Sequence, residues 1–132
     1  MKSTFFEYFN FVAVANNFLQ QHPEESKLKY ALEKVGKMNK TLGDDYSAAV
    51  EDLRIDFCET DEKGIILKDE KGQYKFTKEN TKKFNVAVKA LNDKEIEVKT
   101  WAYDLDQDEF TDEEAKEIFA KFLVEDEKFK VQ

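Results

Sequence analysis

The sequence predicts a mainly α, α+β fold: a helical hairpin with one long helix, a small antiparallel sheet made of a β-hairpin plus one strand, and two further helices. Three observations predict it. Apolar side chains dominate residues 5–19, apolar positions recur every seven residues within 24–58, and short alternating runs between glycine turns follow in 59–76. With 132 residues, of which 41% are hydrophobic, the chain is expected to form a single domain, residues 1–132.

The first helix is expected over residues 5–19, because eleven of these fifteen residues are apolar. Thr4 can cap its start, and Glu7 is placed to complete a capping box. A surface helix needs one apolar stripe, whereas this helix is apolar nearly all round. We therefore expect it to be buried by its own domain or shared with a second chain, and a strand stays an alternative because aromatic and β-branched residues also favour strands. The candidate partner-binding residues are Phe6, Tyr8, Phe11 and Phe18.

A long second helix is predicted over residues 24–58, with the seven-residue spacing of helical hairpins and coiled coils. At about 1.5 Å per residue it would be about 50 Å long. Its far half is therefore expected to pack on later elements or on another molecule. A continuous or slightly kinked helix is favoured over a break at Gly43 with Asp44 as the next cap. The repeating apolar positions are Leu28, Val35, Leu42 and Ala49.

The middle of the chain is expected to follow the order β-β-α-β. Polar turns that end in Gly64 and Gly72 flank a short apolar run, which predicts a β-hairpin. Thr77 is placed to cap the third helix. We expect the strands to form one antiparallel sheet with that helix over one face. The helix is predicted at 78–92 and the strands at 65–68, at 74–76 and from residue 95 to about 100, with Trp101 and Tyr103 extending the last strand.

The last helix is predicted to begin at Thr111, which can form a capping box with Glu114. It belongs to an acidic segment, residues 104–132, which holds eleven carboxylates and four lysines and so carries most of the net charge of −8. Such a segment either keeps the protein dissolved or docks on a basic partner. It follows a helical hairpin (1–58) and a β-β-α-β portion (59–103) within the expected domain.

An acidic motif, Asp104-x-Asp106-x-Asp108, opens like a calcium-binding loop. Such a loop needs a glycine at its sixth place and a bidentate glutamate at its twelfth. These places hold Glu109 and Ala115 here. We therefore expect a helix-capping loop and assign no metal. The candidate acidic docking residues are Asp104, Asp106, Asp108 and Glu109.

No motif in the sequence predicts a reaction, so we expect no enzyme activity, no cofactor and no small-molecule substrate. Glycine-rich phosphate loops, CxxC, HExxH and GxSxG motifs are missing. Cys58 has no histidine near it in sequence to activate it. The net charge of −8 and a single arginine, Arg54, argue against direct nucleic-acid binding. No apolar run is long enough to predict a membrane-spanning helix.

Several short runs carry a resemblance to a known group of proteins: KLKYAL at 27–32, TDEKG at 60–64, DEKGQYKF at 69–76, FN at 84–85, LN at 91–92 and EIEV at 95–98. Across about residues 5–103 the chain resembles a family of small uncharacterised proteins encoded by tailed bacteriophages and prophages. The resemblance implies phage origin and a location in the bacterial cytoplasm of an infected host or in the virion. It implies no catalytic residues.

These observations together lead us to expect a non-enzymatic, phage-encoded protein that works by protein–protein contact. It would be a virion or assembly component, or a self-associating accessory factor. The alternative is an acidic inhibitor, acting as a nucleic-acid mimic, of a host defence protein or of a protein that handles nucleic acid.

Overall fold

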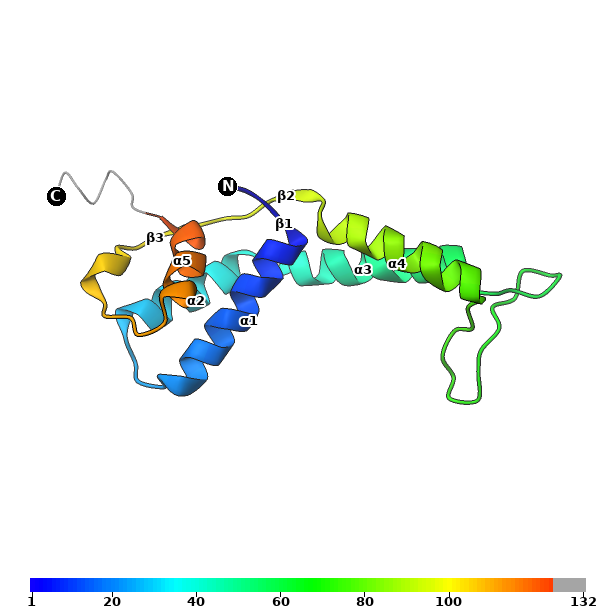
Figure 1. The fold of residues 1–132 in the computed structure, drawn as a ribbon, viewed down its shortest axis with the longest axis horizontal. Helices are drawn as coiled ribbons and strands as arrows, with labels where there is room; N and C mark the ends of the chain where they lie inside the picture. The colour runs from blue at the N-terminus through cyan, green and yellow to red at the C-terminus, as the bar shows by residue number, and fades with distance from the viewer. Residues whose placement is uncertain (125–132) are drawn as a thin grey trace. The chain divides into compact units, whose positions relative to one another are not determined.

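The computed structural model describes residues 1–124, which divide between two compact units (Figure 1). Unit 1 combines residues 1–40 with residues 95–124, and unit 2 is Thr41–Lys94. The predicted mainly α, α+β class is confirmed. The expectation of a single domain over 1–132 stays a prediction, and residues 125–132 of the acidic segment lie outside the described residues. Unit 1 contains β1 (Lys2–Thr4), α1 (Phe5–Gln21), α2 (Lys27–Met38), β2 (Glu95–Glu97), β3 (Trp101–Ala102), a 3₁₀ turn η1 (Leu105–Gln107), α5 (Glu113–Phe122) and β4 (Leu123–Val124), and unit 2 contains α3 (Thr41–Phe57) and α4 (Lys78–Asn92).

Helix α1 begins where the sequence predicts. The Thr4 hydroxyl accepts a hydrogen bond from the backbone N–H of Glu7 at 3.1 Å and lies 3.4 Å from the Glu7 carboxylate. Such a cap satisfies a backbone donor that has no partner within the helix. The helix continues two residues past the predicted end, and His22 closes it with a backbone bond to Phe18.

The predicted strand that begins at residue 95 is interrupted, because β2 and β3 are separate short strands, and β2 pairs with a different partner from the one predicted. β2 runs antiparallel to β1, with Ser3 opposite Ile96. The predicted hairpin strands at 65–68 and 74–76 make isolated bridges instead and lie in unit 2. The expectation of one sheet from all three was therefore wrong. β3 pairs in parallel with β4, which follows α5 directly.

Aromatic side chains from α1 and α5 form the core of unit 1. The ring of Phe11 lies 4.4 Å from that of Phe122 and 6.0 Å from that of Phe119, measured between centroids. Tyr8 meets Phe122 at 6.2 Å in an edge-on arrangement. Such aromatic pairs add about 0.5–1.5 kcal/mol to the gain from burial. The other buried apolar side chains of unit 1 are Phe5, Ala15, Leu28, Ala31, Leu32, Val35, Val98, Leu105, Ala115 and Leu123.

The predicted long helix over 24–58 is two helices, α2 and α3, and the break lies at Asn39 rather than at Gly43. The buried Asn39 side chain donates to the backbone oxygens of Val35 and Lys99 at 2.8 Å each, and it accepts from the Lys99 N–H at 2.8 Å. It thus replaces the helical bonds that end there with bonds to a segment sixty residues away. Gly43 lies inside α3, so the alternative of a break there with Asp44 as the next cap does not hold either.

The last helix begins one residue later than predicted. Asp112, not Thr111, caps α5, because its carboxylate accepts the Ala115 N–H at 3.1 Å. A carboxylate at this place also complements the positive helix end. The expectation of Thr111 as the cap was wrong, although the helix itself is present.

Unit 2 is a pair of antiparallel helices, α3 and α4. At one end of the pair the Tyr46 hydroxyl donates to Asn92 at 2.6 Å, and at the other end the Asn80 side chain donates to the Phe57 carbonyl at 3.1 Å. This second end leads into the connection between the helices, residues 58–77, which we call the tip. Thr77 caps α4 through the Asn80 N–H, and α4 spans the predicted residues 78–92.

The tip of unit 2 contains the same turn twice. Asp61 and Asp69 each accept two backbone N–H bonds at 2.8 and 3.0 Å, and each turn ends in a glycine with positive φ, 82° at Gly64 and 79° at Gly72. Only glycine adopts such a φ without strain. Three backbone hydrogen bonds then link the segments around these turns. The Glu59 N–H donates to the Lys75 carbonyl, the Lys75 N–H to the Leu67 carbonyl and the Leu67 N–H to the Glu59 carbonyl.

We predict that Asn39→Ala destabilises unit 1 by about 1–3 kcal/mol, because the Lys99 backbone then loses both of its partners. Urea unfolding followed by the fluorescence of Trp101, the single tryptophan, measures this. Asn85→Ala, on an exposed position of α4, is the matched control. Equal unfolding midpoints for the two variants would contradict the role of Asn39.

Candidate interaction surfaces

The four aromatic residues of α1 chosen from the sequence separate into two kinds. Tyr8 and Phe11 are buried in the core of unit 1, against α5. Phe18 is half-buried and contacts the rings of Phe110 and Phe119 at 5.9 and 5.5 Å. Only Phe6, with 62% of its surface exposed, is freely available to a partner. The expectation that α1 is buried by its own chain therefore describes Tyr8 and Phe11.

The acidic loop chosen as the alternative site is held by its own hydrogen bonds. The Asp104 carboxylate accepts from the Asp106 N–H at 2.9 Å, and Asp108 accepts from the Tyr103 hydroxyl. Asp106 forms an ion pair with Lys116 at 3.5 Å. Glu109 is exposed. Among residues 1–124, no group of three or more potential ligands is arranged to hold a metal ion.

Tyr103 has a strongly perturbed hydroxyl. Burial raises its pKa above the ordinary value, and the hydrogen bond to Asp108 with the nearby negative charge raises the pKa further. The neutral phenol donates to the carboxylate, whereas a phenolate would repel it. The loop therefore depends on Tyr103 keeping its proton.

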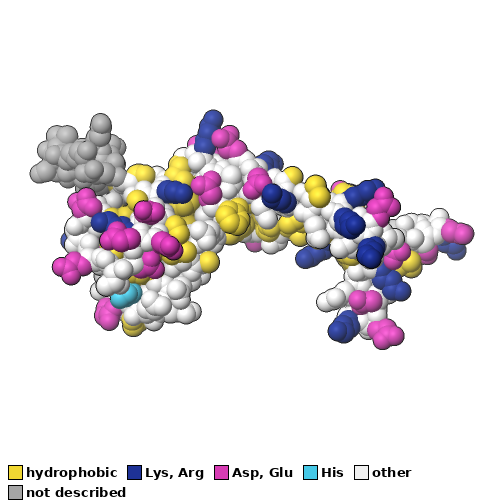
Figure 2. All heavy atoms as spheres, viewed as in Figure 1, with side chains coloured by type: hydrophobic (Ala, Val, Ile, Leu, Met, Phe, Trp, Pro, Cys, Tyr) yellow, Lys and Arg dark blue, Asp and Glu magenta, His cyan; other side chains and the backbone are white. Residues whose placement is uncertain are grey.

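The helices of unit 2 leave a strip of apolar side chains only half-buried, and the sequence alone did not single out this surface. Both helices lie wholly within the described part of the chain, and neither contains a buried residue. Figure 2 shows hydrophobic side chains at the surface of these two helices, between lysine and carboxylate side chains. We call this surface the seam; its half-buried apolar residues are Leu42, Tyr46, Ala49, Val50, Leu53 and Phe57 on α3 and Phe84, Ala87, Val88 and Leu91 on α4.

The two helices beside the seam carry opposite charge. α3 has five carboxylates and one arginine, a net charge of −4, and α4 has four lysines and one glutamate, a net charge of +3. The ion pairs that the structure shows here lie within single helices, Glu51–Arg54 at 3.4 Å and Glu79–Lys83 at 3.5 Å. The charge of each helix is therefore directed largely to solvent.

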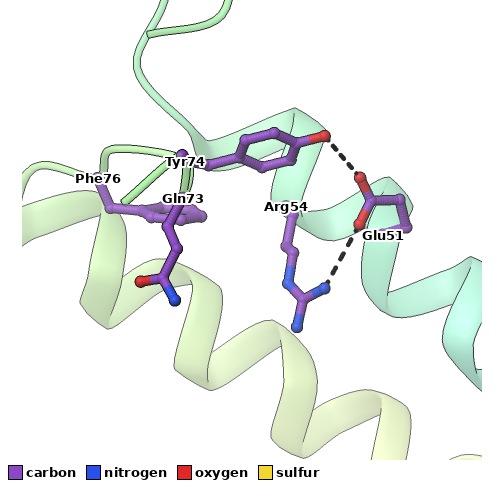
Figure 3. A pocket seen from close by; sticks show the side chains of 6 residues that line it. Glu51, Arg54, Gln73, Tyr74 and Phe76 are labelled. Carbon is purple, nitrogen blue, oxygen red and sulfur yellow. Dashed lines mark hydrogen bonds and ion pairs between the residues drawn. The ribbon is translucent and has the colours of Figure 1, made fainter. Parts of the chain in front are cut away.

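An open hollow of about 530 Å³ lies between α3 and the second turn of the tip (Figure 3). Both carboxylate oxygens of Glu51 are engaged, one by the Tyr74 hydroxyl at 2.9 Å and the other by Arg54 at 3.4 Å. The bond to Glu51 raises the pKa of Tyr74. Phe76 adds a second aromatic wall. One cation and two rings suit contact with an anionic or aromatic group of a partner.

Comparison of the chain with family models, curated proteins and solved structures gives no match. No helix in residues 1–124 has the length and apolar character needed to cross a bilayer.

We predict that Phe11→Ala lowers the free energy of unfolding of unit 1 by about 3–5 kcal/mol, because it leaves a cavity against Phe119 and Phe122. Phe6→Ala, the matched control on the same helix, should change it by less than about 1 kcal/mol because Phe6 is exposed. Urea unfolding followed by Trp101 fluorescence measures both. A similar loss in the two variants would contradict this assignment of core and surface.

We predict that unit 1 loses stability as pH rises above about 10, the ordinary pKa of tyrosine. The unfolded chain releases the Tyr103 proton first because the folded pKa is raised, so the free energy of unfolding falls with pH. Tyr103→Phe should show a shallower fall than the wild type between about pH 9 and 11 in urea titrations. Parallel slopes would show that Tyr103 does not govern the alkaline response.

Proposed function

We propose that the chain is a non-enzymatic interaction protein that binds another protein chain through the seam of its α3–α4 hairpin. One observation carries this proposal: two helices of 17 and 15 residues, each with an apolar stripe, contain no buried residue. Amphipathic helices gain most of their stability from packing that stripe.

The half-buried side chains of the seam have gained only part of the free energy of burial. Fully burying a Val, Leu or Phe side chain is worth about 1.5–3 kcal/mol, and half-buried side chains have gained only part of that. Leu53, Phe57, Phe84 and Leu91 of the seam are all in this state. A protein surface placed over the seam would complete their burial at little conformational cost, because both helices are already formed.

The sequence resemblance supports the biological setting of this proposal. A phage-encoded interaction protein would act as a virion or assembly component, or as a self-associating accessory factor. It would reside in the cytoplasm of the infected bacterium or in the particle. The alternative of an acidic inhibitor stays a prediction without a specific observation in its favour, because Asp104 and Asp108 accept hydrogen bonds within the loop and Asp106 pairs with Lys116 of α5.

Affinity capture with the full chain tests the proposal. Lysate of phage-infected cells would be passed over wild-type chain, Val88→Lys and Val86→Lys, and bound proteins would be quantified by mass spectrometry. Val88 is half-buried in the seam, whereas Val86 on the same helix is 70% exposed and lies away from it. We expect the wild type and Val86→Lys to capture the same protein, which can be a further copy of this chain. Val88→Lys should fail to capture it.

Circular dichroism serves as the control, since Val88→Lys must keep its helical signal for the comparison to count. Identical capture by the two lysine variants, or capture of no protein by the wild type, would overturn the proposal.

A further inference from the structure

We propose that the hollow between α3 and the second turn of the tip binds a carboxylate carried on an apolar group, as a peptide presents at its C-terminus or on an acidic side chain. The hollow shares no residue with the seam, so this inference goes beyond the proposed function. It is carried by the unengaged donors of Arg54 and Gln73 beside two aromatic rings (Figure 3).

Arg54, the single arginine of the chain, keeps most of its capacity to donate hydrogen bonds. A guanidinium has five N–H donors. Within residues 1–124 the Arg54 side chain makes one contact, from Nη1 to a Glu51 oxygen at 3.4 Å, whereas Nε and Nη2 make none. The side chain is about half exposed. The edge formed by Nε and Nη2 can therefore take two oxygens of an incoming group in the parallel arrangement typical of arginine.

Glu51 does not compete for this edge, because both of its carboxylate oxygens are engaged. One accepts the Tyr74 hydroxyl at 2.9 Å, and the other faces Nη1 of Arg54. Asp69, which starts the second turn of the tip, accepts the backbone N–H groups two and four residues ahead. These two carboxylates thus hold the walls of the hollow together, while the outer edge of the guanidinium stays open to a ligand.

Two aromatic rings form the apolar wall of the hollow, and both are held in place. Tyr74 is fixed by its hydroxyl bond to Glu51, and Phe76 packs on Phe84 of α4 with the ring centroids 5.4 Å apart. Between the two rings, Lys75 ties the segment to the rest of the tip through its backbone N–H and carbonyl. A ligand finds the rings already in position, which lowers the entropic cost of binding an apolar group against them.

Gln73 supplies a further polar group to the hollow. Its side-chain amide has no partner within the described residues, and Figure 3 shows it extending in the same direction as Arg54. An amide both donates and accepts, so it matches a peptide group of a ligand. The volume of about 530 Å³ lies in the range of small-molecule sites. It accommodates a carboxylate, one apolar side chain and a neighbouring peptide group.

A carboxylate fits these donors better than a phosphate does. The two oxygens of a carboxylate match one guanidinium edge. A phosphate monoester adds a third oxygen and a second charge. The chain has no second arginine to meet that oxygen, and the charge of Glu51 lies next to the edge. The Lys68 ammonium is placed over the ring of Tyr74, 5.8 Å from its centroid.

Nuclear magnetic resonance titration of the isotope-labelled full chain tests the site. The probes are N-acetylphenylalanine, which has a carboxylate, and N-acetylphenylalaninamide, which lacks one. Because the chain has a single arginine, its Nε–H gives one signal. We expect N-acetylphenylalanine to shift that signal and those of the Gln73 side-chain amide, with a dissociation constant on the order of 1 mM. The amide probe should bind at least about tenfold more weakly.

Variants of Arg54 separate its role from general electrostatics. Arg54→Gln should weaken the binding of N-acetylphenylalanine at least about tenfold, because the guanidinium edge is lost. Arg54→Lys should recover only part of that loss, since an ammonium lacks the planar fork. Lys82→Gln is the matched control, because it removes the same charge from an exposed position of α4 and should leave binding unchanged. Circular dichroism confirms that each variant keeps its helices.

A blocked dipeptide, N-acetyl-phenylalanyl-glutamic acid α-amide, separates the two sources of the carboxylate, because its single carboxylate is on a side chain. Tighter binding than that of N-acetylphenylalanine assigns an acidic side chain, and weaker binding assigns a chain terminus; both results support the site.

Three results would overturn the proposal. The first is equal affinity for the acid and amide forms of acetylphenylalanine, or no shift of the Arg54 signal with either. The second is equal binding of N-acetylphenylalanine by Arg54→Gln and Lys82→Gln. The third is tighter binding of phenyl phosphate than of benzoate, which would assign a phosphate in place of a carboxylate.

Discussion

A pair of helices can cover each other on one side only, and this constraint explains why the two units of the chain differ in burial. In unit 1, α5 supplies a third element. Its Phe119 and Phe122 pack on Phe11, and all three side chains are buried. In unit 2, the described residues supply α3, α4 and a tip of turns. Helices of similar length therefore contain fully buried apolar side chains in one unit and only half-buried ones in the other.

The features predicted correctly from the sequence are those whose physics lies within a few residues. Thr4 and Thr77 cap their helices through bonds three residues away, and α4 spans the predicted residues. The break between α2 and α3 was missed because its cause is remote. Asn39 looks like an ordinary polar residue of a helix until Lys99 comes into contact with it. The pairing of β1 with β2 was missed for the same reason.

The candidate partner-binding residues were chosen on α1 because apolar content does not reveal which surface stays uncovered. Helix α1 is richer in phenylalanine than any other, yet its aromatic side chains meet those of α5, and Tyr8 and Phe11 become core. The seam is made partly of small residues such as Ala49 and Ala87, so it attracts less notice. The signal that was available is the division of charge, since the acidic sign of 41–57 and the basic sign of 78–92 can be read directly from the sequence.

The two Asp-Glu-Lys-Gly turns of the tip bear on how unit 2 folds. Twenty residues connect α3 to α4, and closing so long a flexible loop costs conformational entropy. Each turn, however, is closed by an aspartate that bonds residues two and four places ahead. Contacts this local form on the microsecond scale of hairpins. The tip can therefore assemble early and shorten the effective connection, so that zipping of the two helices starts from the Phe57–Asn80 end and proceeds toward Tyr46 and Asn92.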